Sequence, residues 1–287
     1  MNLNKRVKLL SLSVSTVALF FSTAIYAQSD RLKVHKKVLY NMTFQMDSLN
    51  TASKTTELTE LLLSDTVSLF RTLHKAEQDA TYAAYINNKV IQLSAPVVVT
   101  IGKINNLNYQ ILKSNTGQIK VYDEYSGSNL NHVKEINYYT EPATAMDSWK
   151  LSSDTITIDQ FLCQKAEIDF GGRHWTAWFS TEIPISDGPY KFGKLPGLIL
   201  RLEDSSKTWK FEFQSIQNVD EDIELNKKEN VEIKKINKDK LFKDRRYYQK
   251  NMLSIMESNG GSIAEDRKAA QERLNEVIRK DNNWIEL

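Results

Sequence analysis

The sequence is poor in the residues that build metal centres and covalent cross-links. Its 287 residues include one cysteine and four histidines. The single cysteine, Cys163, excludes a disulfide within the chain. The histidines are scattered, and the sequence contains no HExxH pattern and no cysteine pair. The sequence therefore indicates neither a metal nor another cofactor.

Phosphate-binding motifs and an excess of charge are also missing. A P-loop requires Ser or Thr after Gly-Lys, but Gly193-Lys194 is followed by Leu195. The 38 Lys and Arg nearly balance the 36 Asp and Glu. Three of the basic residues lie within residues 1–27, which leaves 35 against 36 in residues 28–287, a net charge of −1. Without a clustered basic excess, the sequence does not indicate nucleic acid as a partner.

The first 27 residues have the organisation of a secretory signal peptide. Basic residues are followed by an apolar run over 9–25 and by small residues up to Ala27. We expect cleavage after Ala27, export to the periplasm or beyond, and a mature protein that does not span the membrane. A retained transmembrane anchor is the alternative, but the run is near the minimum spanning length and is interrupted by Ser and Thr. Residues 28–287 are predicted to form one domain.

What the chain does contain is a series of short segments with alternating apolar residues, which predict β-strands. The predicted strands are 34–46, a hairpin within 57–70, 97–101, 109–112, 119–122, 133–139, 149–151, 155–158, 161–170, 173–182, 198–202 and 208–216. One helix is predicted at 74–87. Short connections without helices favour antiparallel pairing in a meander.

Near the C-terminus the apolar period changes from that of strands to that of helices. Leu241, Tyr248, Met252 and Ile255 share one helical face, and Ile263, Ala270, Leu274 and Val277 share another. Ser262 and Glu265 predict a capping box for the second helix. We therefore predict a mainly β (α+β) fold, in which a curved antiparallel sheet or open half-barrel over 28–220 is followed by a polar connector, 220–239, and a helical hairpin over 237–280.

The least generic stretch is 171–204. Alternation places Arg173, Trp175, Ala177 and Phe179 on one face of a strand and His174, Thr176, Trp178 and Glu182 on the other. Both faces carry tryptophan, so we expect both to be covered. Three of the five prolines and three glycines lie between this strand and the next. Proline fixes φ, and glycine adopts conformations that other residues avoid, so the connection is predicted to be stiff.

Residues 192–200, FGKLPGLIL, resemble the motif of the GLPGLI family of secreted bacterial proteins. Leu195, Pro196, Gly197, Leu198 and Ile199 match, whereas Lys194 stands where the first glycine belongs. The segments 161–189 and 283–287 are similar to the family's flanking and terminal segments. The resemblance implies no established biochemical activity. It does imply an outer-membrane transport protein as a partner, since members tend to be encoded beside TonB-dependent transporters.

Arg173 shares a strand face with aromatic side chains, where a guanidinium is stacked, paired with a carboxylate or offered to a ligand. Trp178, Tyr190, Phe192 and residues 198–200 are predicted either to line an apolar cavity or to pack as core. The candidate ligand-binding or structural residues are Arg173, Trp175, Trp178, Phe192, Leu195, Pro196, Gly197 and Leu198. No residue is assigned a catalytic role.

Three functions are compatible with this pattern. The first is non-enzymatic binding of a hydrophobic small molecule or peptide in the envelope. The second is an envelope hydrolase that uses carboxylates such as Glu182 and Asp204, or the Cys163 thiol with His174 as its base. Cys163 can equally be a small buried hydrophobe. The third is a structural partner that accepts a strand from another protein at a sheet edge.

Overall fold

The computed structural model describes residues 31–88, 109–123, 135–225, 232–258, 261–263 and 266–286. The strands are β1 (Arg31–Gln45), β2 (Lys54–Leu63), β3 (Val67–Thr72), β4 (Gln110–Ser114), β5 (Gln118–Asp123), β6 (Glu135–Pro142), β7 (Lys150–Ile158), β8 (Phe161–Phe170), β9 (Arg173–Ser180), β10 (Leu198–Asp204), β11 (Trp209–Glu224) and β12 (Glu232–Lys235). The α-helices are α1 (Leu73–Asn88), α2 (Lys238–Ser258) and α3 (Arg267–Lys280), and short 3-10 helices are η1 (Thr51–Ser53) and η2 (Ala143–Ser148). The signal peptide predicted at 1–27 and the strand predicted at 97–101 lie outside the described residues.

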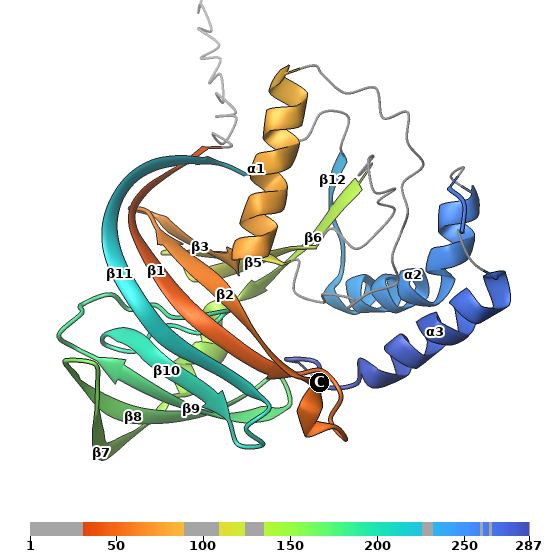
Figure 1. Ribbon diagram of the computed structural model, residues 1–287. Helices are drawn as coiled ribbons and strands as arrows, with labels where there is room; N and C mark the ends of the chain where they lie inside the picture. Colours follow the sequence, from red (N-terminus) through yellow and green to blue (C-terminus); the bar gives the residue numbers. More distant parts are fainter. Residues whose placement is uncertain are drawn as a thin grey trace, which may run out of the picture.

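All the strands belong to one open, strongly curved sheet (Figure 1), which confirms the predicted mainly β fold. Their order is β12-β6-β5-β4-β3-β2-β1-β11-β10-β9-β8-β7. The two long strands β1 and β11 pair at the centre, so the sheet consists of two meanders rather than the single one predicted. Only the β12–β6 pair is parallel among the described strands.

Most predicted strands agree with the structure to within a few residues, and two differ by more. The strands predicted at 149–151 and 155–158 are one strand, β7, with a register shift between Leu151 and Thr155. β11 continues to Glu224, into the predicted connector, which also contains β12. Ion pairs hold this polar end of β11 against β1, including Lys37 to Glu221 at 3.0 Å and Arg31 to Glu224 at 2.9 Å. Val219 and Ile223 of this end also pack against an apolar cluster that includes Leu32 and Val34 of β1.

The connection between β9 and β10, residues 181–197, fills the space enclosed by the curved sheet. We call it the motif loop. Lys113 of β4 donates a hydrogen bond to the carbonyl of Gly188 at 2.6 Å, although β4 and β10 are far apart in the sheet order. Phe192 of the loop is fully buried, with its ring 4.9 Å from that of Trp175 and 6.1 Å from that of Trp149. The loop is therefore part of the main core.

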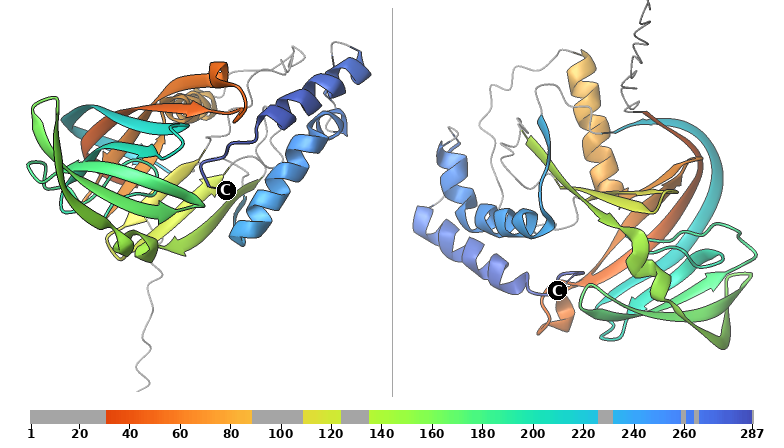
Figure 2. Two further views of the ribbon diagram at one scale, coloured as in Figure 1. Left: turned by 90° about the horizontal axis from the view of Figure 1, so that it is seen from below. Right: turned by 180° about the vertical axis from the view of Figure 1, so that it is seen from behind.

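The helices follow the predicted pattern with two corrections. α1 contacts β2 and β3, and α2 lies along β6 with α3 packed on it (Figure 2). Of the face predicted for α2, Leu241 is buried, whereas Tyr248, Met252 and Ile255 are half-buried, and the other buried residues are Arg245, Gln249 and Leu253. Arg245 is buried because it faces Asp123 and Tyr109 inside the protein. Asp266 caps α3 by accepting from the Ala269 amide at 2.9 Å, so the predicted capping box of Ser262 and Glu265 is wrong.

Within the described ranges, no helix combines the length and the apolar character needed to cross a membrane.

Candidate functional site

The motif loop is held by contacts that restrict the residues it can contain. A side chain at Gly197 would place its Cβ 2.1 Å from the carbonyl oxygen of Ser180, and one at Gly188 would meet Ile199 at 2.7 Å. Neither approach is sterically possible without movement of the chain. Two non-glycine residues of the loop, Tyr190 and Lys194, adopt positive φ, at 55° and 64°. The position of Lys194 is thus one where glycine is the least strained residue.

Most of the predicted motif residues belong to the core. Trp175, Phe192, Leu195 and Leu198 are buried, and so is Gly197, whereas Pro196 is exposed. On the other face of β9, Trp178 is only half-buried and His174 is exposed. The expectation that both faces of this strand are covered is therefore wrong. Phe192 does not line either of the two pockets described below.

Arg173 is buried and paired with a carboxylate, one of the three arrangements predicted for it. Its guanidinium donates to Asp204 at 2.9 Å and to Asn283 at 2.6 Å, and also to the carbonyl of Trp284. Burial alone would raise the pKa of Asp204, but hydrogen bonds from Ser206 and from the amides of Thr208 and Trp209 together lower it. Arg173 thereby ties β9 and β10 to the chain that follows α3.

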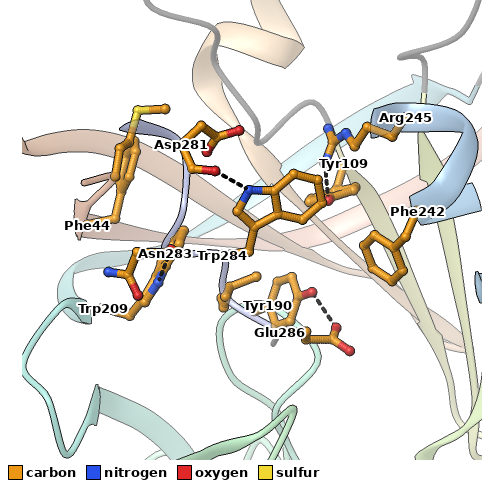
Figure 3. A pocket seen from close by; sticks show the side chains of 12 residues that line it. Phe44, Tyr109, Tyr190, Trp209, Phe242, Arg245, Asp281, Asn283, Trp284 and Glu286 are labelled. Carbon is orange, nitrogen blue, oxygen red and sulfur yellow. Dashed lines mark hydrogen bonds between the residues drawn. The ribbon is translucent and has the colours of Figure 1, made fainter. Parts of the chain in front are cut away.

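This following segment, residues 281–286, occupies a pocket between the sheet and α2 (Figure 3). Phe242 and Arg245 of α2 lie beside the Trp284 ring, with centroid distances of 6.0 and 5.5 Å. Glu286 accepts from Tyr190 at 2.5 Å and also pairs with Lys191 and Lys238. The remaining free volume, about 20 Å³, has room for about one water molecule. This pocket, whose walls include residues of the segment itself, is thus too small for a ligand larger than water.

The residues proposed for hydrolysis are not brought together. Cys163 is buried, and burial raises the pKa of its thiol to about 11. It lies opposite Ile156 of β7, whereas His174 lies opposite Asp169, so the two residues do not form a nucleophile and base. Asp204 is bound by Arg173, and exposed Glu182 accepts from the amide of Leu162. The described residues contain no group of three His, Cys, Asp or Glu arranged to hold a metal.

A second pocket is open and much larger. This cleft lies between the motif loop, η2, the β2–β3 turn and the β4–β5 turn, and its volume is about 370 Å³, within the range typical of ligand sites, about 300–1,000 Å³. Its apolar lining residues are Leu63, Val67, Ile119, Ala143, Met146 and Ile185. Its polar lining residues include Ser64, Asp65, Thr66, Ser68, Lys113, Ser114, Asn115, Gln118, Ser186, Asp187, Lys191 and Lys194.

Charged groups inside the cleft are paired, whereas one hydroxyl is not. Burial lowers the pKa of Lys113, although Asp187 opposes the shift, and the Lys113 ammonium pairs with Asp187 and donates to Phe192 at 3.1 Å. Ser68 lies directly opposite Lys113 in the β3–β4 register and is 4% exposed. Its hydroxyl has no hydrogen-bond partner within the described residues. A buried hydroxyl without a partner is costly, which suits a ligand that supplies one.

Sequence reasoning missed this cleft because its walls come from four segments that are distant in the chain. Of its lining, the residues of the motif loop belong to the stretch that the sequence singled out, whereas the other walls were predicted only as strands and turns. The cleft exists because the sheet curves and brings the β4–β5 turn against the motif loop.

Comparison with known protein families matches the part of the chain that contains the motif loop. Residues 172–201 match a family model described as "Protein of unknown function (Porph_ging)", the family of GLPGLI type. The GLPGLI resemblance is thereby confirmed. The GLPGLI match covers β9, the motif loop and the start of β10, and so includes one wall of the cleft.

More distant comparisons add little to this assignment. No curated protein matches the chain significantly. Solved structures of PNGF-II in its P21 and C2 crystal forms are similar, with 14% and 12% identity and a TM-score of 0.47 for each. These alignments cover 74% of this chain but only 33% and 32% of the PNGF-II chains. The chain therefore spans about a third of the proteins that it resembles in structure.

Proposed function

We propose that this protein is a non-enzymatic binding protein that takes an extended peptide segment in the cleft beside the motif loop. The observation that supports the proposal is the combination of apolar and polar groups in the lining of the cleft with the unpartnered hydroxyl of Ser68. An apolar peptide side chain would pack on the half-exposed Leu63 and Ile185, while its backbone would find donors and acceptors among the polar lining residues. Concave sites of this composition are typical of ligand recognition.

The contacts of the candidate catalytic groups favour binding over hydrolysis. A thiol with a pKa of about 11 is almost fully protonated at neutral pH and is a poor nucleophile. Asp204 is enclosed by donors and is 2% exposed, so it is not available to a substrate. The signal peptide predicted at 1–27 supports a site of action in the periplasm or outside the cell, where a role beside an outer-membrane transport protein is part of the proposal.

A second candidate function is β-strand addition at β7. This strand is terminal in the sheet order, and each of its residues is exposed or half-exposed. An incoming strand would pair with its free backbone groups. Ser153 lies in the irregular stretch between the paired positions Leu151 and Thr155. Ser153→Pro is therefore expected to abolish strand addition without unfolding the protein.

The test is a selection of a phage-displayed library of random hexapeptides on the folded protein. Ser186→Trp fills the cleft from an exposed lining position, and Ser153→Trp places the same side chain on β7 as the matched control. We expect enriched peptides that bind the wild type and Ser153→Trp but not Ser186→Trp. Absence of enrichment, or peptides that bind Ser186→Trp as well as the wild type, would contradict the proposal. Peptides lost only in Ser153→Pro would instead assign binding to β7.

A further inference from the structure

Lys194 combines a strained backbone with an exposed side chain. Its φ of 64° lies in the left-handed region, which glycine adopts without strain and which is unfavourable for residues that have a Cβ. The side chain does not contribute to the core, because the residue is exposed between buried Gly193 and buried Leu195. The chain therefore carries a lysine at a position whose backbone favours glycine, and packing does not explain it.

The three ammonium groups that line the cleft differ in how firmly they are neutralised. Lys113 is held by Asp187 and two carbonyls, and Lys191 is held by Glu286, by Glu141 at 2.5 Å and by the Tyr139 hydroxyl at 2.8 Å. Both lysines are nearly inaccessible, with side chains 11% and 0% exposed. Neither is free to pair with a charged ligand.

Lys194 is different. Its side chain is 35% exposed and pairs with Asp147 at 2.7 Å, and the Asp147 side chain is itself 59% exposed. Such solvent-exposed pairs contribute little stability and exchange partners readily. Lys194 is thus the lining lysine of the cleft that an incoming anionic group can reach by replacing Asp147.

We propose that Lys194 determines the specificity of the cleft and that the ligand is a peptide with an acidic residue. This inference rests on the proposed function. The carboxylate of a ligand Asp or Glu pairs with the Lys194 ammonium in place of Asp147, and a neighbouring apolar side chain packs on Ile185. The buried Ser68 hydroxyl donates to a further acceptor of the same peptide.

The variant that tests this inference is Lys194→Gly, which removes the ammonium and suits the backbone conformation. Hexapeptides selected on the wild type are expected to be enriched in Asp and Glu, and those selected on Lys194→Gly are expected to lose this enrichment. By fluorescence anisotropy, the best acidic peptide should bind Lys194→Gly about two- to fivefold more weakly, the range for an exposed ion pair. Lys194→Glu should bind this peptide more weakly still. Added salt should reduce the difference in affinity between the wild type and the variants.

A control variant distinguishes the ion pair between Lys194 and the ligand from the pair between Lys194 and Asp147 in the free protein. Asp147→Asn removes the partner that the ligand must replace, so the acidic peptide should bind this variant as tightly as the wild type or more tightly. Thermal denaturation should show Lys194→Gly at least as stable as the wild type. Peptides that depend on the cleft but show no acidic preference, or keep it in Lys194→Gly, would overturn the inference and leave the proposed function standing. A library with no cleft-dependent peptides would remove both.

Discussion

Gly197 and Gly117 occupy their positions for different physical reasons. Gly197 has no room for a Cβ, because the Ser180 carbonyl oxygen would be 2.1 Å away. Gly117 has open space around it but a φ of 80°. Gly197→Ala should therefore force β9 and β10 apart and lower the free energy of unfolding by about 1–3 kcal/mol or more, the cost of overpacking. Gly117→Ala serves as the control and should cost about 1–2 kcal/mol from backbone strain alone. Urea denaturation measures both, and a smaller loss for Gly197→Ala than for Gly117→Ala would contradict this assignment.

The reactivity of Cys163 tests whether its thiol can act as a nucleophile. The side chain is fully buried on β8 and the pKa of its thiol is raised to about 11. In the native protein at pH 7.5 we expect no reaction with a maleimide on a timescale at which the urea-unfolded protein is fully modified. Mass spectrometry of the two samples measures this. Rapid modification of the native protein would return Cys163 to consideration as a nucleophile.

At the scale of elements, the sequence predicted best where burial follows a regular period. β1 and β9 bury alternate residues, and their predicted positions were confirmed to within a few residues. The end of β11 was missed because its few apolar residues, Val219 and Ile223, lie among charged residues that pair with β1. The predicted face of α2 was correct at Leu241 but missed Arg245 and Gln249, which a hydropathy pattern places outside and which are buried beside polar groups. Long-range ion pairs are set by tertiary structure and leave no local signal.

The buried Arg173–Asp204 ion pair stabilises the contact of β9 and β10 with the segment that follows α3. It connects Asp204 of β10 to residues 283 and 284, and the side chains of the Arg173–Asp204 pair are 6% and 1% exposed. Arg173→Ala would leave the Asp204 carboxylate buried without its cation, so we expect a loss of about 3–5 kcal/mol. Arg279→Ala breaks an exposed pair with Glu276 and should cost less than about 1 kcal/mol. Urea denaturation of the two variants compares them. Similar losses would mean that Arg173 is not the link between these elements.

At the scale of the whole molecule, the central pairing of β1 with β11 decides where the functional surfaces lie. The sequence predicted the motif loop as a stiff connection but could not place it against the β4–β5 turn. That contact depends on the curvature of the complete sheet and on Lys113 reaching Gly188 across it. Most of the candidate residues of the motif fill the core. The cleft is formed by residues that are ordinary in sequence and meet only in the folded protein.

The segment 281–286 is held in the fold by ion pairs of Glu286, and these pairs predict how the stability of the protein depends on pH. Burial would raise the pKa of Glu286, but Lys191 and Lys238 outweigh burial and hold this pKa below its usual value of 4.5. Between the lowered pKa and about pH 4.5, the folded state therefore binds fewer protons than the unfolded state. The contribution of Glu286 to stability is present above about pH 4.5 and is lost as the pH falls through the lowered pKa. Glu286→Gln should be less stable than the wild type at pH 7, and the difference should shrink as the pH falls below about 4.5. Urea denaturation at several pH values measures the difference, with Glu272→Gln at an exposed position of α3 as the control. A gap that stays constant down to pH 3 would show that the Glu286 charge does not hold this segment in place.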